Sequence, residues 1–482
     1  MKLNCGKIVQ IAVAFAANFL SVLFGLVTAW TSPTIFLLQS PETPLSSGPM
    51  SDDEVSLMTS LMYLSAIGGS VVAGWLANTL GRKWTLFLSA IPQLIAFILI
   101  FFADKAIHIY ISRCLSGIAV GTSIVIIPIF VAEISDKNLR GTVGNFMGVS
   151  ISLGNFFGKF LPNLGGFYLT PIVVCTMVGI FSPILAILPD SPQFLLLKNR
   201  PEAAEKALKF YRGIRKSSPD STAYTTELDE LKKSPSLTKQ KLTLSLRDFC
   251  GGATILSILT SFWLSNHPTF TGNRVLVSYT DKLLRISETD LDIPTMDITV
   301  AAVQLIASIA SIFLISRFGS RLVLIVSFAL SSIAMAIVAT HFHIVETKSG
   351  LNTYSWLFFA AFAIATAIPG SAINSLAFGM ATEIVSPKLR GFLISIYVIL
   401  SWLLGFVFIN YFLALETFWG ISGWIWLFGS WCFMSTILSF FILPDTRGKT
   451  FDDILLLFNK KLPKKWQENT SLTLGIAKNN NP

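Results

Sequence analysis

The sequence contains little charge. Only 13% of its 482 residues are Asp, Glu, Lys or Arg, compared with about 25% in soluble globular domains, whereas 52% are hydrophobic. This composition excludes ordinary soluble enzymes, disordered chains, collagens and coiled coils. Cysteine is scarce as well: the five residues, at positions 5, 114, 175, 250 and 432, show neither a disulfide framework nor metal-ligand spacing.

Motifs for catalysis and for ATP use are also missing. The four histidines, at positions 108, 267, 341 and 343, form no metal-binding set. The chain has neither a phosphate-binding Gly-Lys-Ser/Thr loop nor a nucleophile elbow. We therefore expect no enzyme activity, no cofactor and no metal. The net charge of +9 is compatible with nucleic-acid binding, but its distribution indicates membrane topology, so we expect no nucleic-acid partner.

What the sequence does contain is long apolar runs. A helix needs about 20 apolar residues to cross a bilayer. We identify twelve candidate spans, at 8–31, 56–77, 84–103, 108–132, 142–162, 170–188, 252–280, 293–315, 322–343, 354–381, 392–414 and 421–443. The weakest, 252–280, is interrupted at 265–268 and at Gly272. The sequence predicts an all-α membrane protein with twelve transmembrane helices in a lipid bilayer.

The basic residues predict the orientation. Lys and Arg concentrate on the cytoplasmic side of spanning proteins. With the N-terminus inside, the inner segments hold 29 of the 36 basic residues, and the outer segments and outer helix halves hold six. Arg113, inside a span, is the remaining one. We therefore expect both termini in the cytoplasm.

The two halves of the chain repeat each other. Glu133 and Arg140, which follow the fourth run, return 250 residues later as Glu383 and Arg390, after the tenth. Gly81-Arg82-Lys83 has a weaker counterpart in the second half, Gly319-Ser320-Arg321. Two six-helix pseudo-repeats in the same orientation place a solute site near the midplane, between bundles that rock against each other. The predicted parts are an N-terminal bundle (1–189), a cytoplasmic helical linker (190–246), a C-terminal bundle (247–444) and a cytoplasmic tail (445–482).

Part of the linker is predicted to be helical. Pro201 suits a first helical turn, and Glu202/Lys206 and Glu205/Lys209 are oppositely charged pairs four residues apart. We interpret this stretch as a solvated surface helix.

Motifs at the span boundaries carry a family resemblance. They are Trp30-Thr-Ser-Pro33, Gly74-Trp-Leu-Ala-Asn78, Gly81-Arg82-Lys83, Arg113-x3-Gly117-x3-Gly121, Pro128-Ile-Phe-Val-Ala-Glu133, Pro189-Asp-Ser-Pro192 and Pro444-Asp-Thr-Arg447. Over nearly its full length the chain resembles the sugar-porter branch of the major facilitator superfamily, and most of all the insect facilitated trehalose transporters. The resemblance implies facilitated sugar transport by alternating access, in the plasma membrane, with a monomer sufficient.

The resemblance also implies a cytoplasmic gate built from charged residues. The expected networks are Arg82, Glu133 and Arg140 in the first half, and Arg321, Glu383 and Arg390 in the second. They would form when the inner mouth is shut. The second network is less complete, because Ser316 and Ser320 stand where relatives carry an acid and a second base. The alternative is that these bases only enforce orientation and meet lipid headgroups.

The expected sugar site departs from the family pattern. Relatives place a Gln pair in span seven, where this chain has Pro268 and Thr269, and an Asn where it has Arg274. The Trp of span ten and the Asn of span eleven become Phe378 and Ser401. The expected substrate-binding residues are therefore Gln304, Thr269, Ser401, Phe378, Tyr279 and Trp402, of which Gln304 keeps its amide and Tyr279 the aromatic of the outer gate.

Three explanations of this departure stay open: a sugar bound differently, a non-sugar or anionic solute with Arg274 as counter-charge, or a non-transporting sensor or scaffold. For Gln304 the alternative to ligand binding is an interhelical hydrogen bond, and for Thr269 and Ser401 it is a packing role, which we favour. We expect Arg274 to be a surface charge on the outer side, and Arg113 either to be functional or to reach the outer interface. Span one, Ile8 to Thr31, contains no acid or base, which favours passive facilitation over proton coupling.

Overall fold

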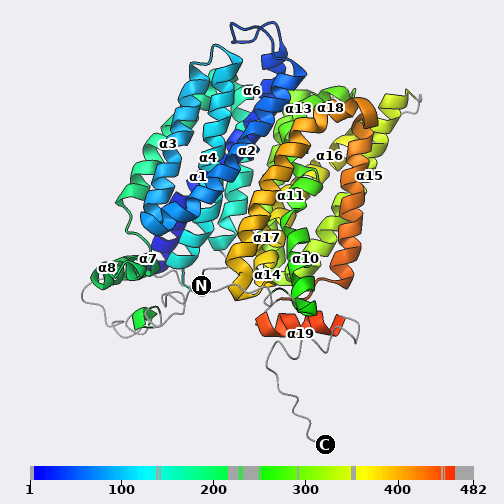
Figure 1. The fold of residues 1–482 in the computed structure, drawn as a ribbon. Coiled ribbons are helices and arrows are strands. Elements are labelled where there is room, and N and C mark those ends of the chain that lie inside the picture. The colour runs from blue at the N-terminus through cyan, green and yellow to red at the C-terminus, as the bar shows by residue number, and fades with distance from the viewer. Residues whose placement is uncertain are drawn as a thin grey trace, which may run out of the picture.

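The computed structural model describes residues 5–136, 139, 143–214, 227–229, 231, 249, 251–289, 292–348, 354–446, 449 and 451–461. All regular elements in these ranges are helices, which run roughly side by side in one bundle (Figure 1). Ten helical stretches of the described residues are long and apolar enough to cross a membrane. The break inside α6 and the broken helix 252–286 account for the other two spans, which agrees with the twelve predicted.

The first half of the bundle contains six spans. Its helices are α1 (Cys5–Gln39), α2 (Asp52–Thr79), α3 (Arg82–Phe101), α4 (Ala106–Ile134) and α6 (Phe146–Ile187). The long helix α6 includes two predicted spans. It breaks at Gly165 and Gly166, where the backbone is not helical.

The second half is less regular. Its helices are α10 (Gly252–Ser265), α11 (His267–Phe270), α12 (Asn273–Ser278), α13 (Thr280–Ile286), α14 (Ile293–Phe318), α15 (Ser320–Thr347), α16 (Ser355–Ile368), η2 (Pro369–Ile373), α17 (Asn374–Glu383) and α18 (Pro387–Phe441, broken at Gly420). The helix breaks at Asn266 and Gly272 fall where the sequence predicts an interruption. Gly272 has a φ of +71°, and a Cβ there would lie 2.3 Å from the Phe428 ring, so this turn requires glycine.

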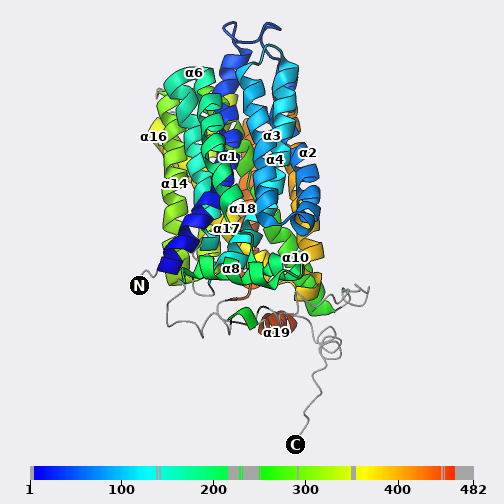
Figure 2. The same cartoon turned by 90° about the vertical axis from the view of Figure 1, so that its left-hand side faces the viewer.

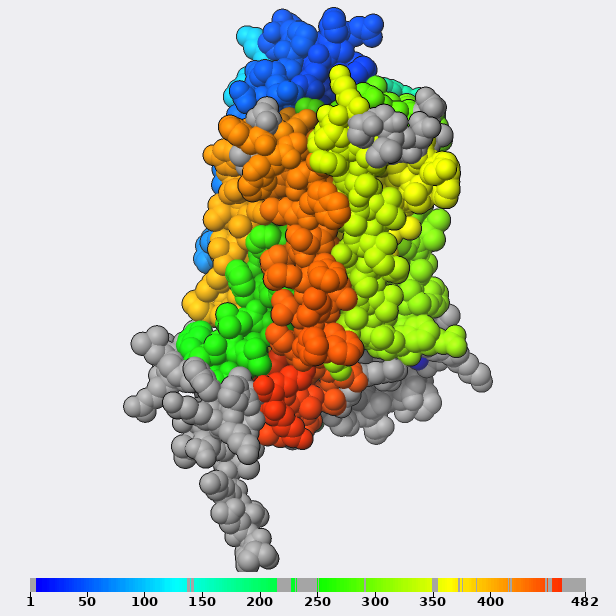
Figure 3. All heavy atoms as spheres, turned by 90° about the vertical axis from the view of Figure 1, so that its right-hand side faces the viewer, coloured from blue at the N-terminus to red at the C-terminus, as the bar shows by residue number. Residues whose placement is uncertain are grey.

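Three short helices lie at one end of the bundle: α7 (Pro192–Leu197), α8 (Pro201–Arg212) and α19 (Phe451–Lys461). The first and last described residues, Cys5 and Lys461, are also at this end (Figures 1 and 2), which we call the linker end. The segment that joins α1 to α2 projects from the opposite, or far, end, as Figure 3 shows in blue.

Helix α8 corrects one expectation. The prediction of a solvated surface helix is wrong for one face of α8, on which Ala204, Leu208 and Tyr211 are buried. The amide of Gln10 in α1 donates to the Tyr211 carbonyl at 3.1 Å. The exposed face carries the predicted Lys209–Glu205 pair, at 2.6 Å. Helix α8 therefore packs against the first half with one face and is exposed to solvent on the other.

The two halves meet mainly through two helix pairs, α2 with α18 and α6 with α14. The repeat equates span two with span eight and span five with span eleven, so the two pairs are related by the internal symmetry. Away from this interface, large apolar side chains face outward: Ile306 is 66% exposed, Phe313 69% and Phe440 60%. Such a surface suits contact with lipid rather than water.

Candidate functional site

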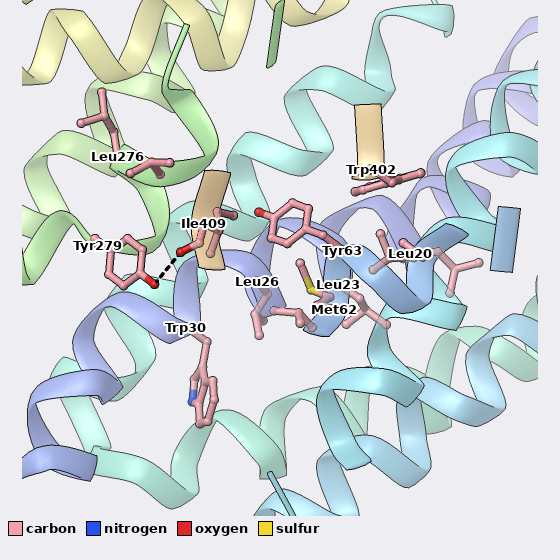
Figure 4. Close-up of a cluster of buried hydrophobic side chains, with 14 of the residues drawn as sticks. Leu20, Leu23, Leu26, Trp30, Met62, Tyr63, Leu276, Tyr279, Trp402 and Ile409 are labelled. Atoms are coloured by element: carbon pink, nitrogen blue, oxygen red, sulfur yellow. Dashed lines mark hydrogen bonds between the residues drawn. The ribbon is translucent and has the colours of Figure 1, made fainter. Parts of the chain in front are cut away.

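Two aromatic rings mark the middle of the interface between the halves. Tyr63 of α2 and Trp402 of α18 lie with their ring centres 5.9 Å apart, and Figure 4 shows them side by side, near Leu20 and Leu23 of α1. Both residues are almost fully buried. The Tyr63 hydroxyl and the Trp402 ring N–H have no hydrogen-bond partner among the described residues. The interface therefore contains apolar ring surface together with unused polar groups.

Arg274 of α12 reaches into this same place. Its guanidinium carbon lies 5.3 Å from the Tyr63 ring centre and 5.0 Å from that of Trp402. It donates to Thr269 Oγ1 at 3.0 Å, to Ser401 Oγ at 3.0 Å and to the Ser401 carbonyl. The expectation that Arg274 is an outer surface charge is therefore wrong. Sequence could not decide its direction, because helix breaks on both sides of α12 leave the rotation of this segment undefined.

Gln304 lies beside Arg274's neighbour, Asn273. A Cβ at Gly370 would lie 2.2 Å from the Gln304 amide nitrogen and 3.0 Å from Asn273 Oδ1, so both amides border the same turn of η2. Gln304 is 2% exposed. No hydrogen bond joins its side chain to another described residue, so the structure gives no support to the interhelical alternative. Asn273, which sequence reasoning did not select, has an equally unpartnered oxygen.

The other expected substrate-binding residues differ in burial and in their contacts. Thr269 and Ser401 are buried and joined through Arg274. Tyr279 is fully buried, stacks on Phe412 at 5.2 Å and donates to the Ile409 carbonyl at 3.3 Å (Figure 4). Phe378 is 39% exposed and forms no ring contact with any described residue. The structure thus brings Thr269, Ser401 and Trp402 together around Arg274, whereas Tyr279 contacts Phe412 and Ile409.

A buried ion pair joins the halves nearer the far end. Lys159 of α6 lies 2.7 Å from Asp297 of α14, and the two side chains are 2% and 1% exposed. Lys159 also donates to Thr280 Oγ1 at 2.7 Å. Sequence reasoning missed this pair. The available signal was one basic and one acidic residue within two different apolar runs, since charges at such depth are normally paired.

Further polar contacts between the halves lie in the middle or at the far end. Ser152 and Ser308 are 2.5 Å apart, and Ser60 donates to Asn410 at 3.0 Å. Closest to the far end, Ser32 accepts from the Asp281 backbone N–H, Lys282 pairs with Asp52, and Arg285 lies over the Phe36 ring. The described contacts between the halves therefore close the far end.

At the linker end, a charge cluster lies within the first half. Arg82, at the start of α3, lies 2.8 Å from Glu133 of α4, and both side chains are largely buried. Glu133 also accepts from the Ser191 hydroxyl, and the Phe194 ring lies 5.2 Å from the Arg82 guanidinium. Two of the three expected residues are therefore paired. The third, Arg140, lies outside the described residues.

Asp190, between α6 and α7, supports this cluster. Its Oδ1 accepts from the backbone N–H groups of Arg82 at 3.1 Å, Lys83 at 3.4 Å and Ser191 at 2.8 Å. Burial raises the pKa of Asp190 above its ordinary value of 3.8, although these three N–H groups favour the carboxylate. The Pro189-Asp-Ser motif thus supplies two members of the cluster that were expected only to mark a span boundary.

The described residues of the second half form no equivalent pair. Arg321 donates to the Phe440 carbonyl at 2.8 Å, and Arg390 to the Val385 carbonyl at 3.4 Å. Glu383 is exposed. No ion pair joins these three described side chains, so the expected second network is not assembled in this conformation.

Arg113 is buried rather than near the outer interface. It is 1% exposed, donates to the Val27 carbonyl and to Thr31 Oγ1, and packs 4.7 Å from the Trp30 ring centre. These partners all belong to α1. Arg113 therefore joins α4 to α1 inside the first half.

Comparison with known proteins agrees with this architecture. The family model described as "Sugar (and other) transporter" matches residues 13–458. The chain belongs to this family of transporters. It is a multi-pass membrane protein with the twelve-helix major facilitator fold.

Curated relatives of this transporter are distant. It is 26% identical over 450 residues to the facilitated trehalose transporter Tret1 of Anopheles gambiae, a match that covers 92% of this chain but 55% of the relative. The Tret1 of Polypedilum vanderplanki is 25% identical over 455 residues, covering 92% and 87%. The transporter thus spans about half the length of some relatives and most of the length of others.

Solved structures show the same fold. The partially occluded inward-open xylose transporter XylE from E. coli has a TM-score of 0.73 and 19% identity, and the match covers 92% of this chain and 99% of XylE. XylE bound to 6-bromo-6-deoxy-D-glucose has a TM-score of 0.72 and 20% identity, covering 93% and 99%.

Proposed function

We propose that this transporter moves a sugar, such as trehalose or a hexose, down its gradient by alternating access. The observation that carries the proposal is the set of unpartnered polar groups between the halves, namely the Asn273 amide oxygen, the Tyr63 hydroxyl and the Trp402 ring N–H, together with the buried amide of Gln304. Amides that both donate and accept, next to an aromatic face, are the groups that a sugar ring requires. The family match and the trehalose transporters among the relatives support the same substrate class.

The proposal assigns roles to the expected residues. Gln304 binds sugar hydroxyls, and Thr269, Ser401 and Trp402 line the same space. Tyr279 belongs to the outer gate, and Phe378 flanks the path toward the linker end. In this scheme the linker end, with both termini, is cytoplasmic and the membrane is the plasma membrane.

The proposal also assigns a state to this conformation. The contacts between the halves, including Lys159–Asp297, lie in the middle or toward the far end. A carrier closed on that side opens toward the linker end. Opening the far end then requires the Lys159–Asp297 pair to separate and the linker ends of the two halves to meet. The Arg82–Glu133 pair lies within the first half and is already formed in this conformation, so closing the cytoplasmic mouth requires further contacts between the halves.

Uptake of labelled trehalose and glucose in oocytes tests the proposal, with surface expression checked and external pH set at two values. We expect saturable uptake that does not depend on pH. In Gln304→Ala the KM should rise about tenfold, because one or two hydrogen bonds to the sugar are lost. Gln93→Ala is the matched control: Gln93 is equally buried and unpartnered but lies in α3, away from the interface. Normal surface expression without flux of either sugar would overturn the proposal.

A further inference from the structure

Arg274 is a cation inside the membrane-spanning bundle that has no carboxylate partner among the described residues. Its three hydrogen bonds go to neutral groups: the Thr269 hydroxyl and the hydroxyl and carbonyl of Ser401. A guanidinium has five N–H donors, so two of them remain unused. An ionisable group at membrane depth is costly, and is normally paired or faces a functional cavity.

The other buried cations show what a structural cation does in this protein. Lys159 is neutralised by Asp297 at 2.7 Å, and Arg82 by Glu133 at 2.8 Å. Arg113 has no carboxylate partner in the part of the chain that the structure describes, but it packs against the Trp30 ring and binds α1 within one half. Arg274 differs from Lys159 and Arg82 in having no carboxylate partner among the described residues. It differs from Arg113 in packing on one ring from each half, those of Tyr63 and Trp402.

The surroundings of Arg274 suit a small hydroxylated ligand. The guanidinium passes directly over the α18 backbone, where a Cβ at Gly405 would lie 2.3 Å from Nη1. The faces of Tyr63 and Trp402 flank it. Asn273, the preceding residue, presents an unpartnered oxygen toward the turn where Gln304 lies. Consecutive residues of α12 therefore supply a positive charge and a neutral group that can bind hydroxyls.

We propose that the transported solute is a sugar acid, whose carboxylate pairs with the unused N–H groups of Arg274 and whose hydroxyls bind Gln304 and Asn273. This inference rests on the proposed function, since it names the substrate class of the same site. A guanidinium binds a planar carboxylate through two parallel hydrogen bonds. A single uncompensated cation matches a monoanion, whereas the doubly charged phosphate of a sugar phosphate would need a second one.

The charge of such a solute has a measurable consequence. A monoanion that moves without a co-ion carries current, so its distribution follows the membrane potential. A potential of 100 mV changes the equilibrium ratio of a monovalent ion by about 50-fold. A neutral sugar moved by the same protein shows no such dependence.

The test uses the full chain in liposomes with an imposed potassium-diffusion potential. Labelled glucuronate and labelled glucose are compared, because they differ only by a carboxylate in place of a hydroxymethyl group. We expect glucuronate to be taken up with the lower KM, by at least tenfold, and to accumulate according to the potential.

Two variants of Arg274 distinguish a role in binding the solute from a purely structural role in holding α12 against α18. Arg274→Gln should lower glucuronate uptake by about 100-fold more than it lowers glucose uptake, as expected for losing a desolvated charge pair. Arg274→Lys should retain potential-dependent glucuronate uptake. A purely structural arginine would instead lower the uptake of both solutes to the same extent. If Arg274→Gln does not fold, the inference is still tested by the dependence of glucuronate uptake on membrane potential, measured in the unaltered protein and in Arg274→Lys.

The failures are distinguishable. Saturable glucose uptake with no uptake of, or competition by, glucuronate overturns the sugar-acid inference and leaves the proposed sugar transport intact. Equal loss of both fluxes in Arg274→Gln also overturns the inference. No flux of either solute through correctly folded protein overturns the inference and the proposed function together.

Discussion

The linker ends of the two halves carry the same sequence motif but different structures. In the first half, Arg82 pairs with Glu133 at 2.8 Å in a largely buried cluster. In the second half, Glu383 occupies the position equivalent to Glu133 but is exposed, and Arg321 binds the Phe440 carbonyl instead. The repeated Glu residue therefore does not determine whether a charge cluster forms.

The difference follows from the register of the arginine. Gly81 and Gly319 both precede a helix with a positive φ, +103° and +83°, so the backbone turn is conserved between the halves. Arg82 directly follows its glycine, whereas Arg321 comes one residue later. One residue on an α-helix rotates the side chain by about 100°. The repeat thus preserves the turn but directs the second arginine away from the glutamate.

The largest effect should come from breaking the first cluster. Arg82→Gln leaves the Glu133 carboxylate buried without its counter-charge, which costs about 3–5 kcal/mol. Arg321→Gln removes one hydrogen bond at a partly exposed site, which costs about 1 kcal/mol. We expect thermal unfolding in detergent to show a much lower Tm for the first variant than for the second.

The two glutamates provide a second test of the comparison. Of Glu133→Gln and Glu383→Gln, measured in parallel, we expect only the first to lower the Tm strongly, because of these two glutamates only Glu133 is paired with an arginine. Equal losses of Tm at the two arginines would show that the second cluster also forms in solution.

A smaller difference in Tm should separate alanine variants of the two glycines, Gly81 and Gly319. Gly81→Ala and Gly319→Ala share the strain of a positive φ, about 1–3 kcal/mol. A Cβ at Gly81 would also lie 2.0 Å from Asp190 Oδ2 and 2.7 Å from the Phe194 ring, whereas at Gly319 it would meet nothing within 4 Å. Overpacking adds about 1–3 kcal/mol. The Tm should therefore fall further in Gly81→Ala, and identical shifts would contradict the role of Asp190.

Much of the fold could be predicted from the sequence, because burial in a bilayer requires long apolar helices. The twelve spans follow from hydropathy alone. The interruption at 265–272 follows from residues that cannot continue a helix, namely His267-Pro268 and Gly272. The ion pair of Arg82 and Glu133 matches two residues that the sequence placed in one network, although their gating role stays a prediction.

The directions of polar side chains inside the bundle could not be predicted. Whether Arg274 faces outward or toward Trp402 depends on the rotation of a six-residue helix between two breaks. Lys159 and Asp297 are 138 residues apart in sequence, and only the packing of α6 on α14 brings them together. Apolar periodicity carries little information here, because helices that face lipid and protein are apolar on both sides.

Moving the arginine by one residue should sharpen the comparison. The double variant Ser320→Arg with Arg321→Ser restores the register of the first half and should direct the guanidinium toward Glu383. The expected gain is about 0.5 kcal/mol, since the site is exposed. A double-mutant cycle with Glu383→Gln measures it as a coupling in Tm. Absence of coupling would mean that the register alone does not explain the difference, and that the companion groups Asp190 and Ser191 are also required.

The smallest effect concerns the pH dependence contributed by Asp190. Because burial raises its pKa above 3.8, this carboxyl group stabilises the folded protein fully below that value, and the contribution is lost as pH rises through the raised pKa. Asp190→Asn keeps an Oδ1 for the three backbone N–H groups but removes the titration. Between pH 4 and 7, the Tm of the variant should therefore fall less with rising pH than that of the unaltered protein. Asp445→Asn, at the corresponding motif position of the second half, is the matched comparison. A steeper pH dependence in Asp190→Asn would show instead that the charge stabilises the start of α3.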